Sequence, residues 1–265
     1  MKLTHALRAF SAIIWRELLR FLHQRERFVA ALVRPLIWLL VFAAGFRAAL
    51  GVSIIAPYQT YVPYETYVVP GLCGMILLFA GMQSSLSMVY DREMGSMRVL
   101  LTSPLPRWFV LFGKLMAGTL VAILQVMAFL IIAKLYGVQL PWLGFLTVLP
   151  ALIIAGMALG AVGLFLSSLI KQLENFAGVM NFVIFPAFFL SSALYPIWKM
   201  KESSILLWRL CSFNPFTHCV EVIRFALYQK FDLLSFSVTM ATLVGFTILA
   251  VISYDPRRAP VKRQV

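Results

Sequence analysis

The chain has 265 residues, of which 62% are hydrophobic and 12% are charged, and it carries a formal net charge of +13. Soluble domains contain about 45–50% apolar and about 25% charged residues, so this chain has too little polar surface to cover a soluble core. Its nearly uncharged runs of about 20 residues predict a polytopic membrane protein. The basic residues lie mainly in the predicted loops and ends, where membrane topology explains them better than nucleic-acid binding does.

Residues 1–27 predict an amphipathic helix that lies in the membrane interface. Charged residues interrupt the apolar stretch, which excludes a cleavable signal peptide. Apolar residues recur at helical spacing, with basic residues on the other faces: Leu3, Leu7, Phe10, Ile14, Leu18 and Phe21. An amphipathic helix packed against the rest of the protein is a compatible alternative.

Six hydrophobic spans follow, and we expect all of them to be helices because an open sheet would leave backbone groups unpaired in lipid. They cover approximately residues 29–50, 67–90, 108–133, 143–170, 176–197 and 234–254. The predicted fold is a single all-α transmembrane domain over residues 1–265.

The distribution of basic residues predicts the topology of these spans. An even number of spans puts both termini on one side of the membrane. If that side is the cytoplasm, the inner segments carry more than twice as many of the 23 basic residues as the outer segments. The positive-inside rule therefore predicts cytoplasmic termini in a cytoplasmic (inner) membrane, and a cytoplasmic segment 91–107 between the second and third spans.

Residues 198–232, the longest outer segment, predict two short helices. Asn214 and Pro215 separate them, because proline disfavours helical geometry in the residue before it. Glu221 and Arg224 are three residues apart and can pair on one face of the second helix. The segment is too polar to span twice and too apolar for free solution, so it predicts an external re-entrant or interfacial hairpin.

Catalytic, nucleotide-binding and metal-binding motifs are missing from the sequence. The Gly-Lys pair at 113–114 lacks the upstream glycine of a nucleotide-binding loop and is followed by leucine instead of serine or threonine. His218 and Cys219 offer too few ligands for a metal ion, so we expect a non-catalytic chain with no metal or cofactor of its own. A Cys211–Cys219 disulfide is conceivable, but with Cys73 the three cysteines provide no wider disulfide framework.

Polar residues inside the predicted spans are few, the main ones being Gln83, Gln125 and Asn181. Their scarcity argues against a proton relay and favours an apolar or amphiphilic substrate. Near Asn181, three aromatic residues share one face of the fifth span and could line a substrate path, or simply contact lipid or protein: Phe182, Phe185 and Phe189. Gly156 and Gly160 allow close helix approach, which we expect within the chain rather than between two copies.

The cytoplasmic segment 91–107 has the composition of a docking element. Three consecutive apolar residues form its centre: Val99, Leu100 and Leu101. Charged residues surround them: Asp91, Arg92, Glu93 and Arg98. Gly95 permits a sharp turn, and Ser103–Pro104 ends the short helix. An apolar centre with a polar rim is typical of a protein–protein interface.

Two motifs carry a family resemblance. The run from Asp91 through Gly95 and Ser96 to Leu100-Leu101-Thr102-Ser103-Pro104-Leu105-Pro106-Arg107 resembles the cytoplasmic coupling segment of type-2 ABC exporter permeases, although Ser96 stands where threonine is common. The run Asn214-Pro215-Phe216-Thr217 with Glu221 and Arg224 is similar to that family's second motif, before the last span. The order of elements matches over essentially the whole chain.

The resemblance implies the transmembrane subunit of an ATP-driven exporter that works as a homodimer with two separate ABC ATPase subunits. ATP and Mg²⁺ would then bind to the ATPase, and segment 91–104 would dock on it. The resemblance also implies that spans 1, 2 and 5 line the substrate path within the membrane lipid.

The substrate class is expected to be a hydrophobic drug-like compound or a lipid, because the outer loops are small and the interior is apolar. A polysaccharide or lipid-linked glycan exporter is the closest alternative. A membrane-embedded enzyme or a channel fits less well, since the three histidines are scattered and no polar pore helix is present.

Overall fold

The computed structural model describes residues 3–23, 25–46, 56–58, 62–93, 106–170 and 172–254. Within these ranges the chain forms ten α-helices and no strand. In chain order they are α1 (Leu3–His23), α2 (Arg25–Phe46), α3 (Tyr64–Glu93), α5 (Arg107–Leu135), α6 (Gly144–Leu169), α7 (Leu173–Phe189), α8 (Ile197–Ser203), α9 (Ile205–Phe213), α10 (Pro215–Leu227) and α11 (Leu233–Ser253).

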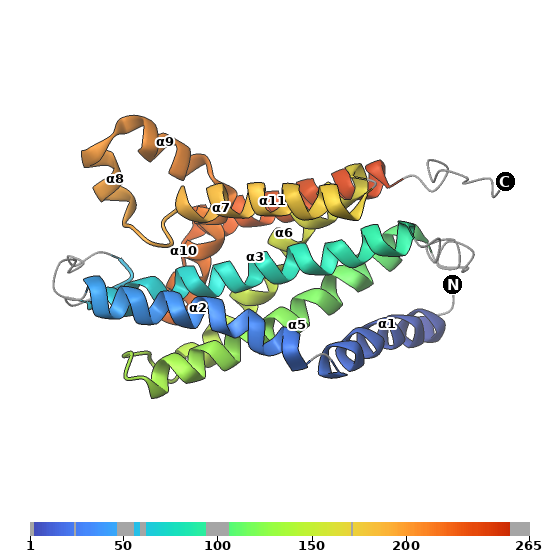
Figure 1. The fold of residues 1–265 in the computed structure, drawn as a ribbon, viewed down its shortest axis with the longest axis horizontal. Coiled ribbons are helices and arrows are strands. Elements are labelled where there is room, and N and C mark those ends of the chain that lie inside the picture. The colour runs from blue at the N-terminus through green and yellow to red at the C-terminus, as the bar shows by residue number, and fades with distance from the viewer. Residues whose placement is uncertain are drawn as a thin grey trace.

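The long helices form an elongated bundle around α6. This helix contacts α3, α11, α10 and α5, and more than half of its residues are buried. Its sequence is apolar on every side, which is typical of a helix in the centre of a bundle. The other long helices run roughly along the same axis, and α8 and α9 project at one end (Figure 1).

Close packing of α3 and α5 on α6 depends on glycine. A Cβ atom added to Gly81 would lie 2.9 Å from the Cα atom of Gly160, and one added to Gly156 would lie 2.9 Å from a methyl carbon of Thr119. The Gly156–Gly160 pair therefore serves contacts within the chain, as expected from the sequence.

Helix α1 packs on the first turns of α5. The ring of Phe10 lies 6.0 Å from the ring of Phe109 and 6.3 Å from that of Phe112. Helix α1 therefore packs against the rest of the protein, which is the compatible alternative that its sequence allows. Its position in the membrane interface stays a prediction. The expected boundary is wrong, because α1 ends at His23 and α2 begins at Arg25.

In the part of the chain that the structure describes, four helices are long and apolar enough to cross a membrane: Tyr64–Tyr90, Trp108–Leu135, Gly144–Leu169 and Leu233–Ser253. The first and fifth expected spans overlap with shorter apolar helices, Phe28–Val41 and Leu173–Phe189. The expected fifth span is too long, since α7 ends at Phe189 rather than near residue 197. Pro186 lies one turn before this end and removes a backbone donor from the helix.

The segment 198–232 contains parts of three helices rather than two. The predicted break at Asn214 is confirmed, because α9 ends at Phe213 and α10 begins at Pro215. However, α10 is not peripheral: it packs on α6, α11 and α3 with one face buried. The reason is its sequence, in which Phe216, Val220, Ile223 and Leu227 recur at helical spacing and are at most 2% exposed.

We predict that Gly81→Ala destabilises the protein by about 1–3 kcal/mol, because the new methyl group meets the backbone of Gly160, which has no side chain to move away. Gly245→Ala on α11 is the matched control, since a Cβ atom there has nothing within 4 Å. Thermal unfolding in detergent measures both. Equal unfolding temperatures for the two variants would contradict the close packing of α3 on α6.

Candidate functional site

A buried turn follows α7 at the end of the bundle where α8 and α9 project. Residues 191–194 of this turn are fully buried between α3 and α10. Helix α3 approaches it so closely that a Cβ atom on Gly71 would lie 2.4 Å from the carbonyl oxygen of Ala193. Buried carbonyl groups need hydrogen-bond donors, so the donors around this turn determine how the hairpin is held.

Two tyrosines at the start of α3 provide the first donors. The hydroxyl of Tyr64 donates to the carbonyl oxygen of Leu194 at 2.7 Å, and that of Tyr67 donates to the carbonyl oxygen of Ser192 at 2.9 Å. The tyrosines are three residues apart and so share one helix face. This spacing is the available sequence signal, but neither tyrosine is among the predicted site residues: Tyr67 begins the predicted second span, and Tyr64 lies just before it.

Asn214 provides the second set of donors. Its side-chain nitrogen donates to the carbonyl oxygens of Ala187 at 2.7 Å and Leu190 at 2.6 Å, so it satisfies carbonyls in the last turn of α7. Its side-chain oxygen accepts from the backbone N–H of Phe216 at 3.0 Å and caps α10. One residue therefore fixes the end of α7 to the start of α10, and Pro215 at the first helical position supports that start.

Arg224 completes the set. It is 2% exposed, and its guanidinium donates to Glu221 and, at 2.8 Å, to the carbonyl oxygen of Ser192. The guanidinium also lies 4.2 Å above the ring centre of Tyr67. The predicted Glu221–Arg224 pair is thus confirmed. Burial lowers the pKa of Arg224, but Glu221, through its charge and its hydrogen bond, outweighs burial together with the neighbouring Tyr67 and Tyr58 and raises the pKa above its ordinary value. We call Tyr64, Tyr67, Asn214 and Arg224 the turn-binding cluster.

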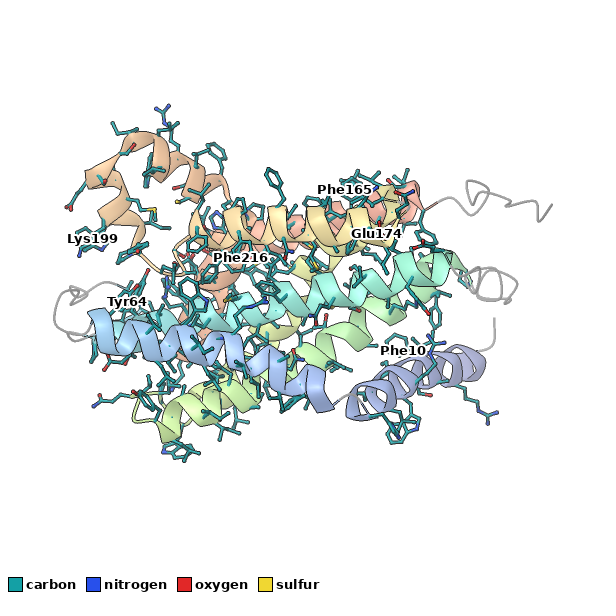
Figure 2. The ribbon with its side chains drawn as sticks, in the orientation of Figure 1. Phe10, Tyr64, Phe165, Glu174, Lys199 and Phe216 are labelled. Atoms are coloured by element: carbon teal, nitrogen blue, oxygen red, sulfur yellow. The ribbon has the colours of Figure 1, made fainter. Side chains whose placement is uncertain are left out.

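The opposite end of the bundle contains the last residue of α3 and the first residue of α7. A side-chain oxygen of Glu93 accepts a hydrogen bond from the backbone N–H of Leu173 at 3.3 Å. A carboxylate at this position also interacts favourably with the α7 dipole. Figure 2 shows Glu174, in the first turn of α7, at this end and Lys199, on α8, at the other.

Most of the predicted docking residues lie outside the described part of the chain: Gly95, Ser96, Arg98, Val99, Leu100, Leu101, Ser103 and Pro104. Asp91 and Arg92 belong to the last turn of α3, but their side chains are also outside it. Of the predicted coupling residues, only Glu93 has a described side chain, and the docking role of the segment stays a prediction.

The predicted path residues share one exposed face of α7. Phe182 is 79% exposed, and Asn181, Phe185 and Phe189 are exposed as well. The rings of Phe185 and Phe189 stack with centres 6.3 Å apart. The ring centre of Trp38, on α2, lies 5.9 Å from the ring centre of Phe189. The structure therefore brings these residues together on an outer surface, and they stay candidates for the path.

The three cysteines are free thiols, so the conceivable Cys211–Cys219 disulfide is absent. Burial raises the pKa of Cys219 to about 12, which makes this thiol a packing group rather than a nucleophile. Within the described ranges, no three His, Cys, Asp or Glu side chains gather where they could hold a metal ion.

We predict that Arg224→Met destabilises the protein by about 3–5 kcal/mol, because the carboxylate of Glu221 and the carbonyl of Ser192 lose a buried partner. The free energy of unfolding in detergent measures the effect. Arg209→Met is the control, since that arginine of α9 is exposed. In the double variant with Glu221→Gln, part of the loss should be recovered. Wild-type stability of Arg224→Met would contradict the role of the cluster.

Comparison with known proteins identifies the family. The sequence profile described as ABC-2 type transporter matches residues 8–228, which include both motifs. The chain is 33% identical over 170 residues to a protein of Escherichia coli (strain K12) named as a multidrug ABC transporter permease, YbhR, covering 63% of this chain and 45% of that protein. The chain thus spans about half the length of that relative.

Other relatives are matched over more of their length. A transport permease named ycf38 of Porphyra purpurea is 27% identical over 230 residues, which is 85% of this chain and 76% of that protein. Nodulation protein J of Rhizobium leguminosarum bv. viciae is 22% identical over 213 residues, covering 80% of this chain and 79% of that protein. With its long apolar helices, the chain is a multi-pass membrane protein that belongs to the ABC-2 type transporter family.

Proposed function

We propose that this chain is the non-catalytic transmembrane subunit of an ATP-driven exporter, coupled through segment 91–107 to a separate ABC ATPase that binds ATP and Mg²⁺. The family and the permease names of its relatives support a transport role. The observation that carries the coupling is the hydrogen bond from Leu173 to Glu93, because it connects the start of this segment to α7 as well as to α3.

The proposed topology has six spans, formed by α2, α3, α5, α6, α7 and α11, in a cytoplasmic membrane. The 22 residues of α2 extend about 33 Å and the 17 residues of α7 about 25 Å, near the roughly 30 Å of a hydrocarbon core. The six helices alternate in direction along the bundle (Figure 1). This arrangement supports cytoplasmic termini, with segment 91–107 on the same side and α8, α9 and α10 on the outer side.

The proposed mechanism transmits motion along rigid helices. Closure of two ATPase subunits moves segment 91–107 in each of two permease copies. The end of α3 and the start of α7 then move together, because Glu93 joins them. The aromatic face of α7 with Asn181, Phe182, Phe185 and Phe189 borders the path in the homodimer. An apolar, aromatic border suits a hydrophobic or amphiphilic substrate such as a drug-like compound or a lipid.

We predict that Glu93→Ala with Arg98→Ala reduces ATPase co-purification and substrate-stimulated ATP turnover at least tenfold in membranes. The double substitution removes polar contacts from the proposed docking segment and the Glu93 bond to α7. Equal amounts of permease in the membranes must be confirmed first.

The matched control for this test is Glu202→Ala with Arg209→Ala. It removes the same two charges from exposed positions on α8 and α9, at the opposite end of the bundle. This control should keep wild-type co-purification and turnover. If the Glu93 and Arg98 variant also keeps both, the docking assignment is wrong.

A further inference from the structure

A small cavity, mostly apolar but with three polar side chains in its lining, lies between α2, α3 and α5. Its volume is about 110 Å³, and its lining includes Arg34 of α2, Phe79 and Gln83 of α3, and Gln125 of α5. These positions are far apart in the sequence and each comes from a predicted span. The folding of three helices against one another therefore brings Arg34, Gln83 and Gln125 to the same cavity.

Arg34 is a positive charge inside an apolar stretch. It lies nine residues after the start of α2, about 14 Å along the helix, and within the apolar range Phe28–Val41. Charged groups at such positions are unfavourable unless they are paired, and they mark functional sites. Among the described residues, Arg34 has no acidic partner; its guanidinium lies 4.0 Å above the ring centre of Phe79.

Gln125 is an independent sign of a ligand. Its side chain is 4% exposed, it lines the same cavity, and its Oε1 atom is buried without a hydrogen-bond partner among the described residues. A buried amide without a partner is unfavourable. Rotation of the amide by 180° exchanges its oxygen and nitrogen, so this group can offer either an acceptor or two N–H donors to a molecule in the cavity.

The combined chemistry favours an anion. A guanidinium binds carboxylate or phosphate oxygens through two parallel N–H donors, and the amides of Gln83 and Gln125 provide further donors. A water molecule could satisfy Gln125, but it would not balance the charge of Arg34, which has no acidic partner within the described ranges. The volume suits a head group rather than a whole amphiphile. Arg34 is itself exposed, and its neighbours on α2 offer apolar surface for a tail: Val33, Ile37, Leu40 and Val41.

We propose that Arg34, Gln83 and Gln125 form a binding site for the anionic phosphate or carboxylate head group of an amphiphilic molecule. The site is reached from the exposed side of α2. The identification of that molecule as cargo rests on the proposed export function, but binding itself does not. The two sources of such a head group are the exported substrate and an anionic membrane phospholipid.

The test measures binding of dodecyl phosphate to the purified full chain in neutral detergent, with dodecyl maltoside as the uncharged probe. Arg34→Gln should weaken dodecyl phosphate binding at least tenfold and leave dodecyl maltoside binding unchanged. Gln83→Glu keeps the size of an exposed side chain but adds a carboxylate to the cavity that Arg34 lines, so it should weaken binding similarly. Arg209→Gln is the control. Wild-type affinity in both site variants would overturn the proposal.

Folding is checked by thermal unfolding of each variant. If Arg34→Gln fails to fold, Gln83→Glu and Arg34→Lys provide the same comparison, with Arg34→Lys expected to keep part of the affinity because it retains charge but loses the planar fork. Selective loss of dodecyl phosphate binding in a folded variant supports the site. Equal loss of dodecyl maltoside binding would overturn it.

Two further measurements distinguish an exported substrate from a membrane phospholipid as the source of the head group. If the site holds a resident phospholipid, native mass spectrometry should find anionic phospholipid bound to the wild-type chain and lost from Arg34→Gln. If it holds cargo, dodecyl phosphate should stimulate ATP turnover of the complex in wild type but not in Arg34→Gln. If the wild-type chain binds no dodecyl phosphate and neither of these two results is found, the proposed site is overturned. Because binding is measured without ATPase, failure of the coupling proposal would leave that measurement unaffected.

Discussion

The buried turn between α7 and α8 is the constraint on which the outer end of the bundle depends. Residues 191–194 are buried, and the carbonyl groups of Leu190, Ser192 and Leu194 accept hydrogen bonds from the turn-binding cluster on α3, on α10 and at the N-cap of α10. An arginine can occupy this interior only because Glu221 and a backbone carbonyl receive its hydrogen bonds. These hydrogen bonds therefore join the turn to the start of α3 and to α10.

Helix α3 connects this unit to the proposed docking segment. Its 30 residues extend about 45 Å, from Tyr64 in the turn-binding cluster to Glu93 beside the start of α7. Glycine contacts hold it against α6 along the way. A displacement at the Glu93 end would be transmitted along the bundle, since close-packed helices resist local deformation. The cavity beside Arg34 lies along the same helix, between α2, α3 and α5.

The helices, the break at Asn214 and the Glu221–Arg224 pair could be predicted from the sequence because they depend on local periodicity, proline geometry and spacing. The end of α7 could not be predicted, since Phe189 is followed by a buried turn whose carbonyl groups depend on donors from helices distant in the sequence. The roles of Tyr64 and Tyr67 depend on the same long-range contacts. Gln83 and Gln125 were recognised as unusual, but their convergence with Arg34 needed the packing of three helices. The docking role of segment 91–107 is predicted from its sequence motif, and the structure describes the helices on either side of it, α3 and α5.

Site-specific cross-linking tests the central claim most directly. The native cysteines are fully buried, so a reagent that acts from water should report mainly on an introduced thiol. A chain with Leu100→Cys, produced together with its ABC ATPase, should cross-link to the ATPase in membranes. A chain with Arg209→Cys, at the opposite end of the bundle, should not. Cross-linking from position 209 but not from position 100 would contradict this account of how the permease is coupled.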